Sequence, residues 1–167
     1  IQEAVKIGVM VNLDSLPLLE RFGQTYGSTV PVCIRINPHI LAGGNLKIST
    51  GHKDSKFGIS IEQLPQILDL VQRYQVPVVG LHLHTGSDIL DASVFLEGGN
   101  VLFEAALHFP ELKFLDFGGG FKVGYHPDDK ATDVAEVGRI VGQAFQAFCA
   151  KYGRQLELWL EPGKFLV

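Results

Sequence analysis

Apolar, β-branched runs alternate with segments of helical periodicity along this whole sequence, and this alternation constrains the fold more than any other feature. Strands are expected at residues 5–11, 30–37, 76–86, 112–120 and 156–163. Helices are expected between them, at residues 15–26, 60–71, 92–108 and 134–148. The order is therefore βαβαβαβαβ, which requires parallel strands joined by crossover helices.

Two architectures contain such a parallel α/β arrangement. One is a doubly wound open sheet, and the other is part of a (β/α)8 barrel of the TIM type. The strands are almost continuously apolar, as expected when both faces of a sheet are buried. A complete barrel needs about 250 residues, whereas this chain has 167. A barrel built from it would therefore be partial, with about five of the eight βα units.

Polar residues gather at the carboxyl end of every expected strand. They are Asn12 and Asp14; Arg35 and Asn37; His82, His84 and Ser87; Asp116 and Gly118–Gly120; and Glu161–Lys164. This edge carries the active site in a barrel and the ligand site in an open α/β sheet. The pattern therefore predicts a ligand site at the strand tips in either architecture.

The composition is that of a globular protein with a mild charge. Apolar residues make up 46% of the chain and charged residues 19%, with a net charge of −4. This balance argues against a nucleic-acid partner, which normally needs a basic patch. No apolar run of about 18 residues occurs, so we expect no membrane partner and a cytoplasmic location. Cys33 and Cys149 are expected to be buried free thiols rather than a disulfide.

Three glycines follow the fourth expected strand in DFGGGF, residues 116–121. Backbone without Cβ atoms can approach an anion closely and direct N–H groups at it, which suits a phosphate. The segment has neither the Lys-Ser/Thr of a Walker loop nor the spacing of the Rossmann fingerprint. A simple tight turn is the alternative interpretation.

Two histidines stand two residues apart in HLHTGS, residues 82–87. Their spacing places both on the same side of a strand. A zinc pair is one interpretation, but the sequence indicates no third ligand at a suitable spacing, so no metal is predicted. In the other interpretation an imidazole stacks on an aromatic ligand. His84, at the strand tip, is better placed for this than His82, and Ser87 could bind a phosphate.

The fifth expected strand ends in EPGK, residues 161–164. If the ligand carries a ring nitrogen, Glu161 would keep it protonated and make the ring an electron sink. Gly163 would let backbone N–H groups approach a phosphate, and Lys164 would supply positive charge. The alternative is a rim ion pair between Glu161 and Lys164, which would contribute little. Lys56, in SKFGI, is expected to face solvent rather than to form a Schiff base.

Taken together, four segments resemble the pyridoxal-phosphate decarboxylases with an alanine-racemase-type barrel, the fold type III decarboxylases. They are RINPHILAGGNLKISTGHKDSKFGI, GLHLHTGSDI, LDFGGGF and EPGK. The resemblance covers essentially the whole chain, and its TGH…SKFGI part is similar to the diaminopimelate branch more than to the ornithine branch. It implies pyridoxal 5'-phosphate as cofactor and the decarboxylation of meso-2,6-diaminopimelate, a small amino-acid substrate, to L-lysine.

The resemblance also implies a role for each matching residue. His84 would stack on the cofactor ring and Glu161 would pair with the ring nitrogen, and these two are the expected catalytic residues. Arg35 would lie beneath the ring. Lys164 would contact the phosphate or the substrate, at a position where the family usually has arginine. The residues expected to hold the phosphate are Ser87, Gly118, Gly119, Gly120 and Gly163.

By the same resemblance, residues 1–167 correspond to barrel strands four to eight. The first barrel strands, the lysine that binds the cofactor and a C-terminal β domain would then lie outside this chain, and Lys6 does not match that lysine. A homodimer is expected for the full-length protein. Three alternatives stay open: a decarboxylase of ornithine, arginine or carboxynorspermidine; a non-catalytic barrel that binds pyridoxal phosphate; and a folded relic that binds nothing.

Overall fold

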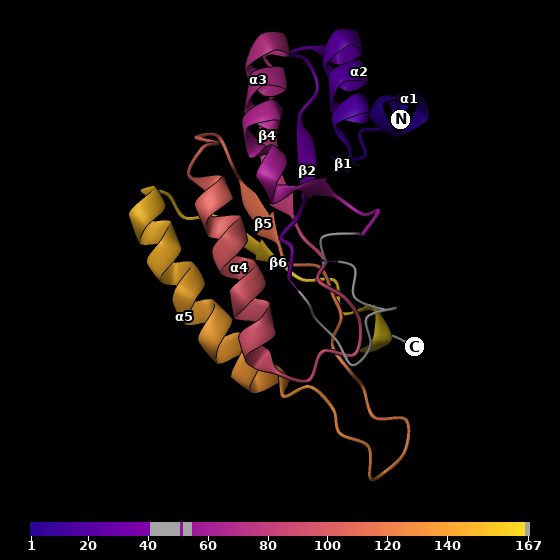
Figure 1. The fold of residues 1–167 in the computed structure, drawn as a ribbon, viewed down its shortest axis with the longest axis vertical. Coiled ribbons are helices and arrows are strands. Elements are labelled where there is room, and N and C mark those ends of the chain that lie inside the picture. Colours follow the sequence, from indigo (N-terminus) through magenta and orange to yellow (C-terminus); the bar gives the residue numbers. More distant parts are fainter. Residues whose placement is uncertain (41–50, 52–54, 166–167) are drawn as a thin grey trace.

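A computed structural model describes residues 1–40, 51 and 55–165 and shows a parallel sheet whose strands alternate with helices (Figure 1). The strands are β1 (Val11–Leu13), β2 (Val32–Asn37), β3 (Ile59–Ser60), β4 (Val78–His82), β5 (Phe114–Asp116) and β6 (Glu157–Trp159). The helices are α1 (Gln2–Lys6), α2 (Leu16–Tyr26), α3 (Leu64–Tyr74), α4 (Ala92–Ala106) and α5 (Val134–Tyr152), with 3-10 turns η2 (Ile61–Gln63) and η3 (Gly163–Phe165).

The order of the strands decides between the two expected architectures. Neighbouring strands follow one another as β1-β2-β4-β5-β6, all parallel, and the short β3 pairs with the end of β2 outside this path. A doubly wound sheet reverses its strand order at a switch point, and this sheet has no such reversal. The fold is therefore a partial (β/α) barrel, one of the two architectures that the sequence predicts.

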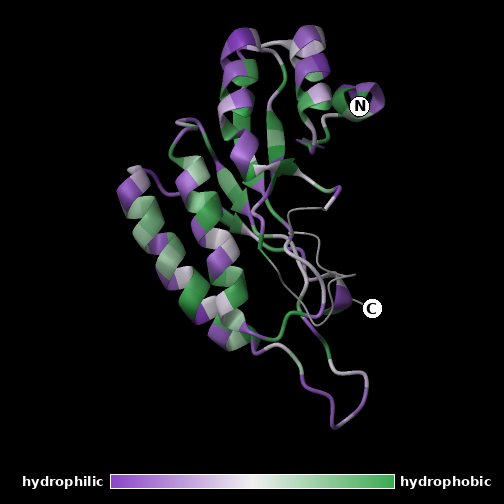
Figure 2. Cartoon of the chain, viewed as in Figure 1, coloured by the Kyte–Doolittle hydropathy of each residue, from purple (hydrophilic) through white to green (hydrophobic). Residues whose placement is uncertain are grey.

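One face of the sheet packs against the helices. Ile34, Leu81 and Leu115, from three adjacent strands, are fully buried in one apolar cluster with helix residues such as Leu102 and Phe145. Helix α2 packs against α3 and α4 packs against α5 (Figure 1). The apolar colouring of the strands and of the sheet-facing sides of the helices follows this core (Figure 2).

The opposite face of the sheet is arranged in rows across the strands, as in the interior of a barrel. In the first row Cys33 pairs in register with Gly80, and Gly80 with Phe114. Glycine is needed at position 80 because a Cβ there would lie 2.1 Å from a ring carbon of Phe114. The Phe114 ring in turn stacks on Trp159 at 3.8 Å between centroids. This apolar layer forms the floor of the strand-tip region.

The prediction of a strand at residues 5–11 is wrong for the first part of this range. Residues 2–6 form helix α1, and the strand begins only at Val11. Periodicity alone cannot separate a helix from a strand in so short an apolar run. Two local features favour the helix: an ion pair of 2.7 Å between Glu3 and Lys6, one turn apart, and the left-handed Gly8 (φ 74°) that follows the helix.

The remaining expected strands and helices are present. The strands are shorter than expected, whereas α3 and α5 extend beyond their expected C-terminal ends, and β3 adds a strand that the sequence does not indicate. Both cysteines are buried free thiols, as predicted. Among the described residues, no helix combines the length and apolarity needed to cross a membrane. Most of the loop between RINP and SKFGI, which carries the most specific part of the resemblance, lies outside the described residues.

Candidate active site

The candidate site lies where the carboxyl ends of β2, β4, β5 and β6 meet. Backbone hydrogen bonds between the loops that follow the strands fix its shape. The Glu161 N–H donates to the Gly118 carbonyl at 2.8 Å, and the Ile89 N–H donates to the Gly120 carbonyl at 2.9 Å. The loops after β4, β5 and β6 are thereby tied together around the glycine run.

Glycine is required in this run because the loops approach one another so closely. A Cβ at Gly119 would lie 2.3 Å from the carbonyl oxygen of Glu161, and a Cβ at Gly120 would lie 2.3 Å from that of Gly86. Gly118 and Gly120 also have φ values of 65° and 100°, which disfavour other residues. Any side chain here would push the three loops apart.

A cavity of about 180 Å³ opens between these loops. Its lining residues are His84, Ser87, Gly119, Gly120, Phe121, Glu161, Pro162, Gly163 and Lys164. These include all the predicted site residues except Arg35 and Gly118. A larger cavity of about 460 Å³ lies between α1 and α2, but none of the predicted site residues lines it. The smaller cavity at the strand tips is therefore the candidate site.

His84 is fixed at the cavity by the glycine run. Its Nδ1 accepts a hydrogen bond of 3.1 Å from the N–H of Gly119, so a neutral ring carries its proton on Nε2. Burial lowers the pKa of the half-buried His84 imidazole, and the nearby Arg35 charge adds to this, while Glu161 opposes it. His84 is therefore a neutral flat ring at the rim of the cavity, as stacking on an aromatic ligand requires.

Beneath the cavity, His82 and Asp116 form a second polar layer with Glu161. His82 and Asp116 face each other in register on β4 and β5, and both are buried. One side-chain nitrogen or oxygen from each of the three residues lies within 4.8 Å of the others. His82 is more deeply buried than His84. The two carboxylates beside it could not be found from sequence spacing, because strand register brings them there.

Burial shifts the pKa values of these two side chains in opposite directions. It lowers the pKa of His82 to about 3, and the nearby Arg35 charge adds to this. It raises the pKa of Asp116 to about 6, and the nearby Glu161 carboxylate adds to this, although a hydrogen bond from the Gly118 N–H opposes it. His82 is therefore neutral, and Asp116 titrates close to neutral pH.

Lys164 is held at the other side of the cavity by a residue that the sequence does not single out. Its Nζ lies 2.6 Å from Oδ1 of Asp88, which directly follows Ser87 in the chain. The rim ion pair considered between Glu161 and Lys164 is thus replaced by one between Asp88 and Lys164. Hydrogen bonding to Asp88 raises the pKa of Lys164, so this lysine is fully charged at neutral pH.

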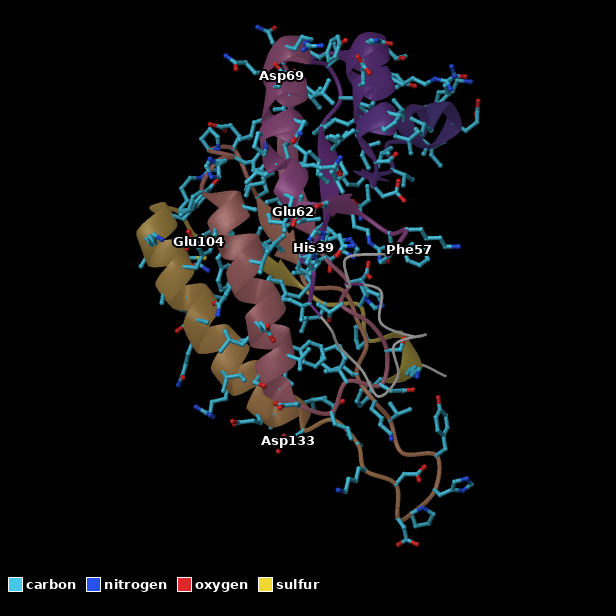
Figure 3. The ribbon with its side chains drawn as sticks, viewed as in Figure 1. His39, Phe57, Glu62, Asp69, Glu104 and Asp133 are labelled. Carbon is cyan, nitrogen blue, oxygen red and sulfur yellow. The ribbon has the colours of Figure 1, made fainter. Side chains whose placement is uncertain are left out.

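Arg35 lies in the second row, beside His82, rather than in the lining of the cavity. Its guanidinium stands 5.1 Å from the ring centre of Phe57, which Figure 3 labels on the loop leading to β3. His39 and Glu62 are labelled nearby in Figure 3, and His39 Nδ1 lies 3.8 Å from Glu62 Oε1. Lys56 is exposed, as predicted. Arg35 therefore contributes positive charge beneath the site.

These elements suit a ligand that combines a flat ring with an anionic tail. His84 offers a ring face, Glu161 a carboxylate, and the glycines, Ser87 and Lys164 a cationic, hydrogen-bonding rim. Comparison with known proteins agrees with this class. Residues 1–167 match the family model described as "Pyridoxal-dependent decarboxylase, pyridoxal binding domain". The chain belongs to this family, whose cofactor is pyridoxal phosphate.

Relatives of the chain within this class are named diaminopimelate decarboxylases. The enzyme of that name from Methanothermobacter thermautotrophicus is 31% identical over the whole chain, which spans 40% of its length. A crystal structure of a diaminopimelate decarboxylase superposes with a TM-score of 0.88 and 29% identity, covering 99% of this chain and 39% of that one. The crystal structure of the Helicobacter pylori enzyme complexed with L-lysine superposes with a TM-score of 0.83 and 28% identity, covering 99% of this chain and 42% of that one.

Proposed function

We propose that this chain is the cofactor-binding part of a diaminopimelate decarboxylase, which converts meso-2,6-diaminopimelate to L-lysine. The observation that carries the proposal is the assembly of His84, Glu161 and the glycine run around one cavity at the strand tips. The names of the relatives support the substrate. Because the chain spans about 40% of their length, the activity of the whole protein is an inference from them.

The residues present fit pyridoxal phosphate. The glycine run lets the three loops approach one another closely, and Ser87, Gly119, Gly120 and Gly163, which line the cavity between these loops, would hold the phosphate there. Lys164 would supply positive charge to the phosphate or to a substrate carboxylate. His84 would lie against one face of the ring, since its imidazole is neutral and fixed by Gly119. Arg35 would add positive charge from below.

When bound, pyridoxal phosphate supplies an electron sink for the pair of electrons released as the carboxylate leaves Cα. Glu161 makes this sink effective by holding a proton on the ring nitrogen, because an adjacent carboxylate favours the charged form of a base. His84 and the glycine loops orient the ring and exclude water from one face. The catalytic contribution of the chain is therefore position and electrostatics.

We further propose how the chain is completed in the intact protein. Strands that close the barrel, the lysine that binds the cofactor and a C-terminal β domain would come from outside residues 1–167, and two copies would form a homodimer. The 40% coverage of the relatives supports the additional segments. A cytoplasmic location would fit an enzyme of amino-acid biosynthesis with two free thiols.

A substrate panel tests the proposed function. The intact protein, loaded with pyridoxal phosphate, is given meso-diaminopimelate, ornithine or arginine, and the amine product is measured by mass spectrometry. We expect L-lysine from meso-diaminopimelate with a kcat/KM at least 100-fold above the values for the other two. A preference for ornithine or arginine would contradict the substrate assignment, and cofactor binding without any product would favour a non-catalytic barrel.

A further inference from the structure

The second polar layer beneath the cavity is not explained by the folding of the barrel. His82 is only 4% exposed and Asp116 8%, and they sit side by side on β4 and β5. Buried polar side chains normally have hydrogen-bond partners, because moving a polar group out of water without giving it a new partner costs free energy. A neutral apolar pair at these two positions would pack the barrel interior at lower cost. The layer therefore points to a function.

His82 is the clearer of the two cases. Among the described residues, neither of its ring nitrogens has a hydrogen-bond partner. The nearest approach is from Nε2 to Oε2 of Glu161, at 3.6 Å. Because the His82 imidazole is neutral, this approach is not a salt bridge. His82 thus forms an uncharged wall on the inner side of the Glu161 carboxylate.

Asp116 is anchored so that its charge faces Glu161. Its Oδ1 accepts a hydrogen bond of 2.8 Å from the Gly118 N–H, which fixes the carboxylate in the strand-tip layer. Glu161 in turn is held through its own N–H by the Gly118 carbonyl. One glycine therefore positions the Asp116 carboxylate and the backbone of Glu161, and repulsion between the two carboxylates opposes the ionisation of Asp116.

We propose that Asp116 and His82 are positioning residues for Glu161: Asp116 strengthens the hold of Glu161 on the ring proton, and His82 closes its inner side against water. The inference rests on the role proposed for Glu161. A second negative charge behind Glu161 stabilises a positive ring nitrogen in front of it. A neutral imidazole wall keeps the carboxylate turned toward the cavity.

The charged and titratable groups around this pair come from each packed element. They are Asp14 after β1, Cys33 and Arg35 on β2, His82 on β4, His84 after β4, and Asp116 itself on β5. Burial raises the pKa of Cys33 and lowers that of His82 to about 3, so these two stay neutral near pH 6, and burial lowers the pKa of His84 as well. Asp116 is thus the group expected to change charge there.

The test uses Asp116→Asn in the intact protein loaded with pyridoxal phosphate, with Glu97→Gln at an exposed position of α4 as a surface control. We expect kcat with meso-diaminopimelate to fall on the order of 10-fold, as for other partners that orient a functional group. The wild-type decline in kcat below about pH 6 should be absent. The pH dependence of the absorbance of the bound cofactor should change in the same way. The control should behave as wild type.

Thermal stability separates this role from a structural one. The folded-state pKa of Asp116 is raised, so its ionised form opposes folding at pH 7, and Asn relieves this while keeping the Gly118 hydrogen bond. The melting temperature of Asp116→Asn should therefore rise by a few degrees at pH 7, with the gain lost as pH falls toward 3.8, the ordinary pKa of an aspartate. If Asp116 only supported the fold, its substitution would lower the melting temperature of the protein.

The combined variant with Glu161→Gln completes the test, since a residue that acts through Glu161 has no further effect once Glu161 is changed. Asp116→Asn should leave the kcat and the cofactor spectrum of Glu161→Gln unchanged. His82→Gln should do the same. Additive losses, or an unaltered pH profile in Asp116→Asn, would overturn the inference while the wild type still produces lysine. A wild-type protein that produces no lysine would overturn the proposed function as well.

Discussion

Lys164 shows how a single residue can depart from its family and still be given a defined position. The resemblance to the family implies arginine at this position, and a planar guanidinium could bind an anion through two parallel hydrogen bonds, which an ammonium group cannot do. Here the ion pair with Asp88 fixes the ammonium group beside Ser87 and the glycine loop. The charge is retained, and its direction is set by a residue 76 positions earlier in the chain.

Removing this charge should weaken binding at the cavity without affecting the fold. We expect Lys164→Ala to raise the dissociation constant of pyridoxal phosphate about tenfold, equal to about 1.4 kcal/mol, because the site is half-exposed and the interaction is partly screened. Fluorescence titration of the intact apoprotein measures this. Lys113→Ala, at an exposed position before β5, is the control. An unchanged affinity would assign Lys164 to the substrate alone.

His82 should leave a mark on the pH dependence of stability. Its folded-state pKa is lowered to about 3 from 6.5. Between these pH values the unfolded chain therefore binds a proton at His82 that the folded chain does not bind. Its contribution to stability is therefore present above about pH 6.5 and is lost as pH falls toward 3. Denaturant unfolding at several pH values should show a shallower acid loss in His82→Gln than in wild type. Parallel curves would mean that His82 is protonated in the folded state.

At the scale of elements, most helices and strands follow from local sequence. Helix α5 is the clearest example, because Val137, Val141, Phe145 and Phe148 form one buried stripe, and the expected helix begins at the same residue. The exception is α1, because the apolar run at residues 5–11 is too short for its periodicity to separate a helix from the predicted strand. Element type could be predicted because it is local, whereas strand register and loop packing depend on residues far apart in the chain.

The packing of the loops after β5 and β6 makes a prediction about a glycine. Gly119→Ala would place a Cβ 2.3 Å from the Glu161 carbonyl oxygen, so the loop carrying Glu161 must move. We expect a loss of about 1–3 kcal/mol in unfolding free energy, together with weaker cofactor binding.

A glycine in α5 provides the matched control for this substitution. A Cβ at Gly142 would meet nothing within 4 Å, and alanine is the better helix former, so Gly142→Ala should stabilise the protein by about 0.5–1 kcal/mol. Both values come from denaturant unfolding, and cofactor titration is run beside them. Equal behaviour of the two variants would contradict the close packing of Gly119 against Glu161.

At the scale of the whole molecule, the partial barrel leaves apolar surface at its β6 side. Trp159, Leu160 and Phe165 are each more than two-fifths exposed. Phe165 and Leu160 line an apolar cavity of about 320 Å³. An exposed strand edge with apolar neighbours favours pairing between chains. The 167-residue chain alone should therefore self-associate at concentrations on the order of 10 µM.

Sedimentation velocity over a range of concentrations checks this. The variant Leu160→Lys places a charge on the same surface and should shift the distribution toward monomer. If the chain stays monomeric at every concentration, with or without the substitution, the surface beside β6 does not mediate self-association.

The site as a whole was predictable in its membership but not in its geometry. His84, Ser87, the glycines, Glu161, Gly163 and Lys164 could be singled out because each follows a strand and carries a recognisable chemistry. The partnership of Asp88 with Lys164, and that of His82 and Asp116 with Glu161, could not. These contacts depend on which strands are neighbours and in which register, and a single sequence does not contain that information in readable form.

The most direct test is the turnover of meso-diaminopimelate by the intact protein carrying Glu161→Gln, beside the surface control Glu97→Gln on α4. Glu161→Gln keeps the size of the side chain but removes the charge that holds the proton on the ring nitrogen. We expect kcat to fall by about 10²–10³-fold with cofactor still bound, and the control to keep wild-type turnover. Wild-type turnover in Glu161→Gln would contradict the role of Glu161, and with it the site that we describe.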